Sequence, residues 1–348
     1  MEKDHFFEFM RKIPKAEIHL HLEDFIAGQG VKEETIDNLD KFISIYHSLL
    51  DSISAIEDLN IAFKRLVAYM NDNGIVYAEV FFSPIRYVRN MGFSYPDLVR
   101  YFEETLYRVK EKFNIVIKLI PDMSRTYGPE VSDKFLDMMI ENPSKDIIGV
   151  GLGSAEGGFQ NRDYVEVFEK ARKHGLRTVA HAGESIGPDS IRDAVEILEA
   201  ERIGHATSAI FDESLVEMLV AKQIPLEIQP TSNLVTGAFV KNLEDHPVRE
   251  YLDRGAFITI NTDDPTLFNT TLLDEYWKLY DIMDFKLRHI YHIIVNGFMA
   301  SFMSNAKKRD YIRQVNRKWN RGFLLKNRDE TIWQSEIMNR FKGGNDGA

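Results

Sequence analysis

Short apolar runs alternate with amphipathic stretches along most of the chain. Eight runs of strand length, rich in β-branched and aliphatic residues, cover residues 16–22, 75–82, 115–120, 147–153, 177–183, 202–206, 225–230 and 257–264. Between them lie stretches such as 163–175, 189–201 and 212–223, in which apolar residues recur every three or four positions, as in amphipathic helices. Eight β-α units in a chain of 348 residues predict a (β/α)8 TIM barrel of the α/β class. Counting strands leaves an open doubly wound sheet as the alternative.

Two segments lie outside this repeat. Residues 25–72 read as a helical insertion after the first strand, and residues 271–341 as a set of C-terminal helices. Residues 342–348 have the composition of a disordered tail. No proline-rich linker or low-complexity block divides the chain, so we predict a single domain over residues 1–348.

The composition excludes several classes of function. A formal net charge of -11 argues against a nucleic-acid partner, because binding to the phosphate backbone depends on clustered Lys and Arg. The absence of cysteine excludes disulfides, thiolate nucleophiles and zinc sites built on sulfur. The first ten residues lack the features of a signal peptide, and the apolar stretch 293–303 is too short to span a bilayer. We therefore predict a cytoplasmic protein that acts on a small molecule, without a membrane partner; the oligomeric state is not predicted.

Two histidines stand one residue apart in the first predicted strand. Side chains two apart on a strand point to the same face, so His19 and His21 project together, away from their aliphatic neighbours. This arrangement suits a shared metal ion. A buried neutral pair, each ring hydrogen-bonded to a carboxylate, is the better explanation for one HxH motif alone, because short motifs recur by chance.

Polar residues at other strand ends make a shared metal ion a better explanation than a buried neutral pair. His181 and Glu184 follow the fifth predicted strand, His205 ends the sixth, and Asp263 and Asp264 end the eighth. The C-terminal strand ends of a barrel share one rim, where so many polar groups need an ion or a substrate to satisfy them. Histidine nitrogens with one aspartate oxygen suit a divalent cation, most often zinc, with iron or manganese as alternatives. Zinc would lower the pKa of a bound water to about 7 and so make a nucleophile for hydrolysis.

Two of these residues have the right places for proton transfer. Glu184, three residues beyond His181, is placed to give a proton to the leaving side of a substrate, and His205 can orient or deprotonate the water. The remaining histidines have ordinary explanations. His174 lies near a helix end, where a cation is favoured; the others are read as surface or core-edge residues, namely His5, His47, His246, His289 and His292.

Five ordered motifs carry a family resemblance. The segments KIPKAEIHLHLE, VAHAGE, RIGH, PTSN and NTDDP occur in the same order as in the adenosine deaminase family of the amidohydrolase superfamily, which this chain resembles from about Ile13 to Phe302. The resemblance implies a metal-dependent barrel that replaces the 6-amino group of a purine by oxygen and releases ammonia. It implies one zinc ion per chain held by His19, His21, His181 and Asp263.

The same resemblance implies roles for further residues. Glu184 would protonate the ring nitrogen N1, and His205 with Asp263 would position the attacking hydroxide. Asp264 would share a proton with N7. The backbone N–H of Ser154, beside Gly153, would meet N3. Glu23 stands where relatives have a residue that contacts the ribose, and it is assigned to substrate binding.

Departures from the family pattern bear on the substrate. Asp24, Ser154 and Ala206 replace glycines of the family motifs and are expected to narrow the pocket. Adenosine is the first expected substrate; adenine, aminodeoxyfutalosine and methylthioadenosine are the alternatives. Another mononuclear amidohydrolase and a non-catalytic barrel are remote alternatives. Five aromatic residues are candidates for the pocket lining, although such residues more often belong to the core: Phe25, Phe42, Phe81, Phe82 and Tyr87.

Overall fold

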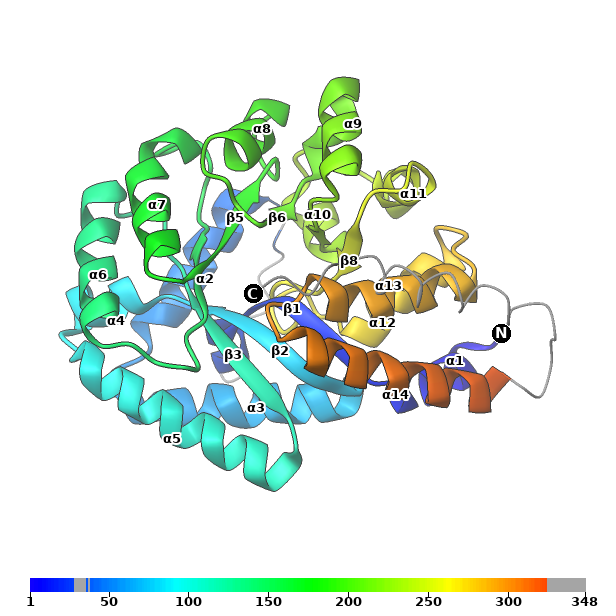
Figure 1. Ribbon diagram of the computed structural model, residues 1–348, viewed down its shortest axis with the longest axis horizontal. Coiled ribbons are helices and arrows are strands. Elements are labelled where there is room, and N and C mark those ends of the chain that lie inside the picture. Colours follow the sequence, from blue (N-terminus) through cyan, green and yellow to red (C-terminus); the bar gives the residue numbers. More distant parts are fainter. Residues whose placement is uncertain (28–35, 37, 324–348) are drawn as a thin grey trace.

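Eight parallel strands form the centre of the molecule (Figure 1). The computed structural model describes residues 1–27, 36 and 38–323. Each of the eight predicted strands is present: β1 (Lys15–His21), β2 (Ile75–Phe82), β3 (Val116–Pro121), β4 (Gly149–Leu152), β5 (Arg177–Ala182), β6 (Arg202–His205), β7 (Leu226–Ile228) and β8 (Ile258–Ile260). Their residues are almost entirely buried, as expected for parallel strands covered by helices.

The strands close into a barrel. Two ladders are formed in chain order: β1, β2 and β3 pair in one sheet, and β4, β5, β6, β7 and β8 pair in the other. Isolated bridges between Leu119 and Ile147 and between Asp122 and Gly151 connect β3 to β4. At the other seam, the N–H of His21 donates to the carbonyl of Asp263 over 3.1 Å, and the N–H of Asp263 donates to the carbonyl of His19 over 3.2 Å. The TIM barrel is therefore confirmed, and the open sheet is excluded.

Helices surround the barrel (Figure 1). In chain order they are α1 (Lys3–Lys12), α2 (Leu39–Asp51), α3 (Leu59–Asn73), α4 (Pro84–Met91), α5 (Tyr95–Phe113), α6 (Pro129–Glu141), α7 (Val165–Lys173), α8 (Pro188–Glu196), α9 (Glu213–Lys222), α10 (Pro230–Thr236), α11 (Val248–Asp253), α12 (Leu272–Asp281), α13 (Leu287–Ala300) and α14 (Asn305–Phe323). Short 3-10 helices are η1 (Leu22–Ile26), η2 (Ile56–Asp58), η3 (Asn161–Tyr164), η4 (Thr207–Phe211) and η5 (Leu243–Asp245). The three predicted helices at 163–175, 189–201 and 212–223 correspond to α7, α8 and α9.

The two predicted additions to the repeat are helical where the structure describes them. The insertion at 25–72 contains α2, η2 and most of α3, and the C-terminal set contains α12, α13 and α14. Residues 324–341 of that set, and the tail predicted at 342–348, lie outside the described residues. The single domain over 1–348 stays a prediction. No helix in the described part of the chain is both long and apolar enough to cross a membrane.

The barrel interior differs from the layer between strands and helices. That outer layer is apolar, whereas a separate small apolar cluster of Phe81, Ile120 and Val179 lies beside His19 and His181. Gly151 is required beside this cluster, because a Cβ atom there would lie 2.5 Å from the Phe81 ring. Below the rim the interior is filled by fully buried charged side chains, an arrangement that needs each charge to have a partner.

Candidate active site

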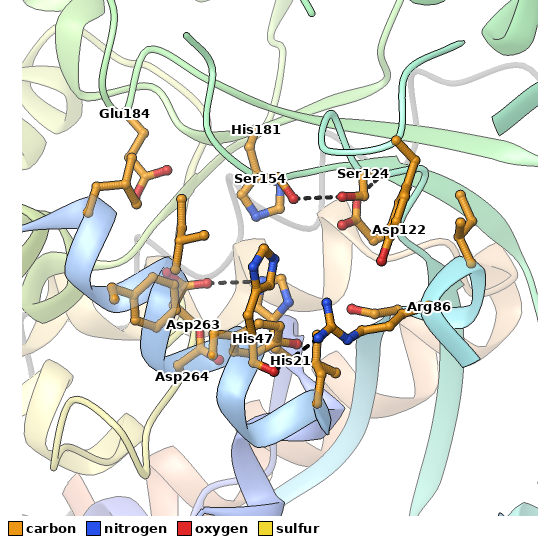
Figure 2. Close-up of a pocket in the computed structure, with 18 of the residues that line it drawn as sticks. His21, His47, Arg86, Asp122, Ser124, Ser154, His181, Glu184, Asp263 and Asp264 are labelled. Carbon is orange, nitrogen blue, oxygen red and sulfur yellow. Dashed lines mark hydrogen bonds and ion pairs between the residues drawn. The ribbon is translucent and has the colours of Figure 1, made fainter. Parts of the chain in front are cut away.

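The predicted polar residues meet at the C-terminal ends of the strands. The imidazole rings of His19, His21, His181 and His205 lie near one another, with ring centroids of neighbouring pairs 4.5–5.6 Å apart. His205 lines a cavity at this rim together with His21 and His181, which Figure 2 labels, whereas His19 is completely buried. Gly204 gives His19 its space, because a Cβ atom at that position would lie 2.7 Å from Cε1 of the His19 ring.

Asp263 is the centre of this group. Its Oδ1 atom lies 3.3 Å from Nε2 of His19 and 3.2 Å from Nε2 of His21. Its Oδ2 atom accepts a hydrogen bond of 2.7 Å from the Ser232 hydroxyl. Burial opposes ionisation of this carboxyl, but the contacts with His19 and His21 outweigh it and hold the pKa of Asp263 well below its usual range. Asp263 is therefore a carboxylate in the folded protein.

The backbone is strained at two of these residues. His205 has φ 66° and Asp263 has φ 68°, both in the left-handed region that non-glycine residues seldom occupy. Such a conformation costs on the order of 1–3 kcal/mol per residue and persists where the surrounding structure enforces it, often at functional sites. Both side chains line the cavity.

The residues present fit a divalent metal ion. The ligand atoms of His19, His181, His205 and Asp263 lie within 4.8 Å of one another, and those of His21, Asp263 and Asp264 form a second, overlapping group. Within the described residues, Nε2 of His19 and Nδ1 of His181 are buried without a hydrogen-bond partner. Unpartnered buried nitrogens beside a carboxylate are costly unless an ion satisfies them, and histidine with carboxylate is a donor set that borderline divalent cations prefer. The predicted ligands therefore come together, but their division between metal and substrate stays a prediction.

Glu184 lies at one edge of the cavity, on the loop after β5. Burial, followed by the charge of Asp263, raises the pKa of Glu184 to about 8, so its carboxyl carries a proton at neutral pH. Its Oε2 atom lies 3.6 Å from Nε2 of His205. The loop is held by the buried carboxylate of Glu156, which accepts the backbone N–H groups of four consecutive residues, 183–186, over 2.7–3.2 Å. Glu184 is thus a positioned proton donor.

Asp264 and Ser154 also line the cavity. Burial, with the neighbouring charge of Asp263, raises the pKa of Asp264 well above its usual range, and its Oδ1 is buried without a partner among the described residues. A neutral carboxyl of this kind can donate to a ring nitrogen; the contact of Asp264 with N7 stays a prediction. The N–H of Gly153 is already engaged, because it donates to Oδ1 of Asp122 over 2.6 Å. Ser154 adopts φ 69°, and its hydroxyl lies 2.7 Å from that of Ser124 (Figure 2).

Glu23, which was predicted to bind the substrate, makes its contacts within the protein. Glu23 is completely buried and does not line the cavity; its carboxylate accepts from the Ser83 N–H, from the Tyr46 hydroxyl and from the Tyr87 hydroxyl. It organises the wall behind the cavity, and direct contact of Glu23 with a substrate stays a prediction.

Two of the three glycine replacements do not narrow the pocket as expected. The Asp24 carboxylate accepts the backbone N–H groups of Thr266 and Leu267, each over 2.8 Å, and so holds the loop after β8. Ala206 is buried outside the lining; of the three, Ser154 alone faces the cavity. Among the candidate aromatic residues, Phe42 lines the cavity and the rest are buried in the core.

Further residues line the cavity; the insertion at 25–72 was expected to lie over the pocket, but of its residues on α2 only Phe42 was named in advance as a candidate for the lining. The helix α2 forms one wall, with apolar and aromatic side chains spaced by three or four residues: Leu39, Phe42, Ile43, Tyr46, His47 and Leu50. Arg86 on α4 is the one Arg or Lys among the described residues that line the cavity, and in Figure 2 it lies across from Glu184 and Asp264. His47 was read as ordinary and in fact lines the wall. His246 was read as a surface residue; this was wrong, because His246 is buried and bonded to Asn233.

Comparisons with known proteins agree with this arrangement. A family model described as adenosine deaminase matches residues 27–318. The aminodeoxyfutalosine deaminase of Streptomyces avermitilis is 30% identical over 322 residues, which cover 86% of this chain and 89% of that protein. The adenine deaminase of Acinetobacter baylyi is 29% identical, covering 89% of this chain and 98% of that protein. The crystal structure of adenine deaminase from Arthrobacter aurescens superposes with a TM-score of 0.82 and 26% identity, covering 88% and 98% of the two chains.

Proposed function

The chain belongs to the adenosine deaminase family of hydrolytic deaminases, and from that premise we propose that it replaces the 6-amino group of a purine by oxygen. The observation that carries the proposal is the protonated carboxyl of Glu184 beside His205, on the rim of a cavity that also contains the ionised Asp263. Glu184 can give a proton, and the group of histidines around Asp263 fits a cation. Metal-assisted hydrolysis of a carbon–nitrogen bond uses both.

We propose that His19, His21, His181 and Asp263 hold one zinc ion, with iron or manganese as alternatives. The ion, when bound, would lower the pKa of a water molecule and so supply a nucleophile at neutral pH. The chain's own residues supply the proton and the hydrogen bond to the purine ring. Glu184 gives its proton to N1 of the ring, which makes C6 more electrophilic, and Asp264 donates to N7. Water adds its oxygen at C6; one of its protons returns to Glu184 and the other joins the amino group, which leaves as ammonia when the C6–N6 bond breaks, so that no oxidant or reductant is needed.

The substrate that the cavity supports best is an adenine with a substituent at N9. The cavity encloses about 730 Å³ of empty space, a volume that includes open solvent at its mouth. Its outer wall, on α2, is apolar and aromatic, and Arg86 adds a permanent positive charge. A substituent with an apolar body and an anionic group would complement this wall. Aminodeoxyfutalosine is a compound of this kind, and one of the similar proteins bears its name.

Adenine is the second candidate. It is favoured by the solved adenine deaminase that superposes on most of this chain. Adenosine, the substrate first expected from the motifs, is named by neither of the two relatives compared above, and it serves here as a test compound.

The experiment is to incubate zinc-loaded protein with aminodeoxyfutalosine, adenine, adenosine, deoxyadenosine and methylthioadenosine and to follow ammonia release. The highest kcat/KM is expected for aminodeoxyfutalosine; a preference for adenine would favour the second candidate, and no release from any compound would refute deamination of 6-aminopurines.

A charge-specific prediction concerns Arg86. Its Nη2 atom contacts the carboxylate of Asp51, whose side chain is 67% exposed, and the carbonyl of His47 over 3.3 Å. An exposed partner contributes little and is easily exchanged for a substrate anion. Arg86→Gln is expected to lower kcat/KM for a carboxylate-bearing adenine nucleoside by about 10- to 100-fold, the size of one charged hydrogen bond, with much less effect on adenosine.

The matched control is Asp51→Asn, which removes the ion pair and leaves Arg86 in place. We expect it to keep or raise kcat/KM for the carboxylate. Equal losses in both variants, or equal losses with both substrates, would mean that Arg86 only ties α2 to α4.

A further inference from the structure

A chain of buried hydrogen bonds determines which nitrogen of His205 carries the proton. It begins at a backbone group whose role is fixed: the N–H of Val248 donates to Nδ1 of His246 over 3.0 Å. Nδ1 of His246 is therefore an acceptor, so the proton of the neutral ring is on Nε2, which donates to Oδ1 of Asn233 over 3.2 Å. The Asn233 amide is thereby oriented, and its Nδ2 donates to Nδ1 of His205 over 2.9 Å. The neutral His205 ring must then carry its proton on Nε2, the atom nearest Glu184 and Asp263.

Burial makes this chain well defined. His205 is 1% exposed, and Asn233 and His246 are each 3% exposed, so water does not compete for these donors and acceptors. In both rings Nδ1 accepts a hydrogen bond, so each ring carries a single proton, on Nε2, and is neutral. Neither ring nor amide can reverse its direction without leaving a buried polar group unsatisfied.

A second chain sets the opposite tautomer of His19. Nδ1 of His19 lies 2.7 Å from Oε2 of Glu227, and the other oxygen of Glu227 lies 2.5 Å from Nε of Arg202. Arg202 is also paired with Glu79, over 2.5 Å, and all three charged side chains are 0–1% exposed. Arginine only donates, so Oε1 of Glu227 faces the cationic Arg202 side chain, and Oε2 is left to accept a hydrogen bond from Nδ1 of His19. When the metal is bound, the proton of the neutral His19 ring is then on Nδ1, and Nε2 presents its lone pair to the ion rather than a proton to Asp263.

We propose that these two chains give the two histidines opposite tasks: His205 presents an N–H to the cavity, and His19 presents a lone pair to the metal. Asn233 and His246 are the positioning residues for His205, and Glu227 is the positioning residue for His19. The use of these tautomers in deamination rests on the proposed function. The consequence is specific, because a ring that already carries its proton on Nε2 cannot take one there. His205 donates a hydrogen bond to the oxygen that adds at C6, and it neither deprotonates the water through Nε2 nor binds the metal.

The wild-type protein tests the tautomers directly. Histidine labelled with ¹⁵N in the zinc-loaded protein gives long-range ¹H–¹⁵N spectra in which protonated and unprotonated ring nitrogens are distinct. We expect His205 to be protonated on Nε2 only and His19 on Nδ1 only. A proton on Nδ1 of His205, or on Nε2 of His19, would overturn the proposal. The measurement uses no substrate, so it is independent of whether the proposed reaction is correct.

Asn233→Asp is the variant that reverses the His205 tautomer. A carboxylate at this position can only accept, so the proton of His205 should move to Nδ1 and leave Nε2 without one. We expect kcat to fall about 10²- to 10³-fold, the effect of losing one donor to a developing negative charge, with metal content unchanged. The spectra should report the shift of the proton. A reversed tautomer with normal turnover would refute the role of the N–H.

Glu227→Gln is the variant that reverses the His19 tautomer. Because Arg202 only donates, the glutamine must turn its oxygen to Arg202 and its NH₂ group to Nδ1 of His19, which forces the proton onto Nε2. We expect metal affinity to fall about 10- to 100-fold in competition with a chelator. Glu79→Gln is the matched control, since it disturbs the same arginine without contact to His19. It is expected to lower the melting temperature of the metal-free protein and to leave metal affinity near the wild-type value; an equal loss of affinity in both variants would refute the role of Glu227.

Discussion

Glu184→Gln is expected to lower kcat by about 10²- to 10⁴-fold, the usual contribution of general acid–base catalysis. Burial raises the pKa of Glu184 to about 8, so the wild-type carboxyl is protonated at neutral pH and can give that proton to the ring. Glutamine has nearly the same shape, and its amide is far too weak an acid to give up a proton. Steady-state ammonia release with the preferred 6-aminopurine measures the effect.

The metal content of this variant separates chemistry from binding. Glu184 lies 3.6 Å from His205 and is not one of the predicted ligands, so the variant should keep about as much zinc as the wild type. Its loop should also stay in place, because Glu156 holds that loop through backbone N–H groups that the substitution does not change. Near-normal turnover in a folded, zinc-loaded variant would refute the role of Glu184 as acid.

Asp263→Ala is expected to abolish metal binding and, with it, measurable turnover. The substitution removes the carboxylate that lies 3.2–3.3 Å from Nε2 of both His19 and His21. Three neutral imidazoles are left without the negative charge that balances a divalent cation, and the oxygen donor is lost. Metal analysis after dialysis against buffer with a trace of zinc measures the first effect, and ammonia release measures the second.

The neighbouring residue provides the control. Asp264→Asn keeps the predicted ligand set and removes the neutral carboxyl assigned to N7, so it should retain metal and lose turnover. Ser232→Ala removes only the hydrogen bond to Oδ2 of Asp263 and should retain most of both. Metal content near one per chain in Asp263→Ala would contradict the ligand assignment.

The sequence predicts the barrel and its rim because both follow from local patterns. Parallel strands buried on both faces appear as short apolar runs, and all eight were visible in this way. Polar residues at the C-terminal ends of such runs lie together on one rim of a barrel. His181, His205 and Asp263 were found by this signal, and the structure brings them together.

The partners of buried charges could not be predicted in the same way. Glu79, Arg202 and Glu227 stand inside strand runs, which shows that each needs a partner, but they belong to β2, β6 and β7 and meet only through barrel closure. Glu23 and Asp24 follow a motif whose carboxylates suggest substrate contact. Their actual partners lie about 60 and 242 positions away along the chain, so no local pattern identifies them.

His246 illustrates the same limit at the active site. A histidine next to a proline in a polar loop is usually exposed, and nothing near it in the sequence points to His205. Asn233 lies on α10 and His246 lies between η5 and α11, and the fold brings both into line with that ring. The signal that could have found Asn233 was the PTSN motif, whose serine and asparagine contact Asp263 and His205 respectively.

The central claim is that one metal ion lies among four particular side chains. Anomalous diffraction from crystals of zinc-loaded protein, collected at the zinc absorption edge, tests it most directly. The account predicts one strong peak within bonding distance of His19, His21, His181 and Asp263, with Nε2 of His205 outside the coordination sphere. A zinc-loaded crystal without a peak among these side chains, or with the peak bonded to His205, would contradict the account.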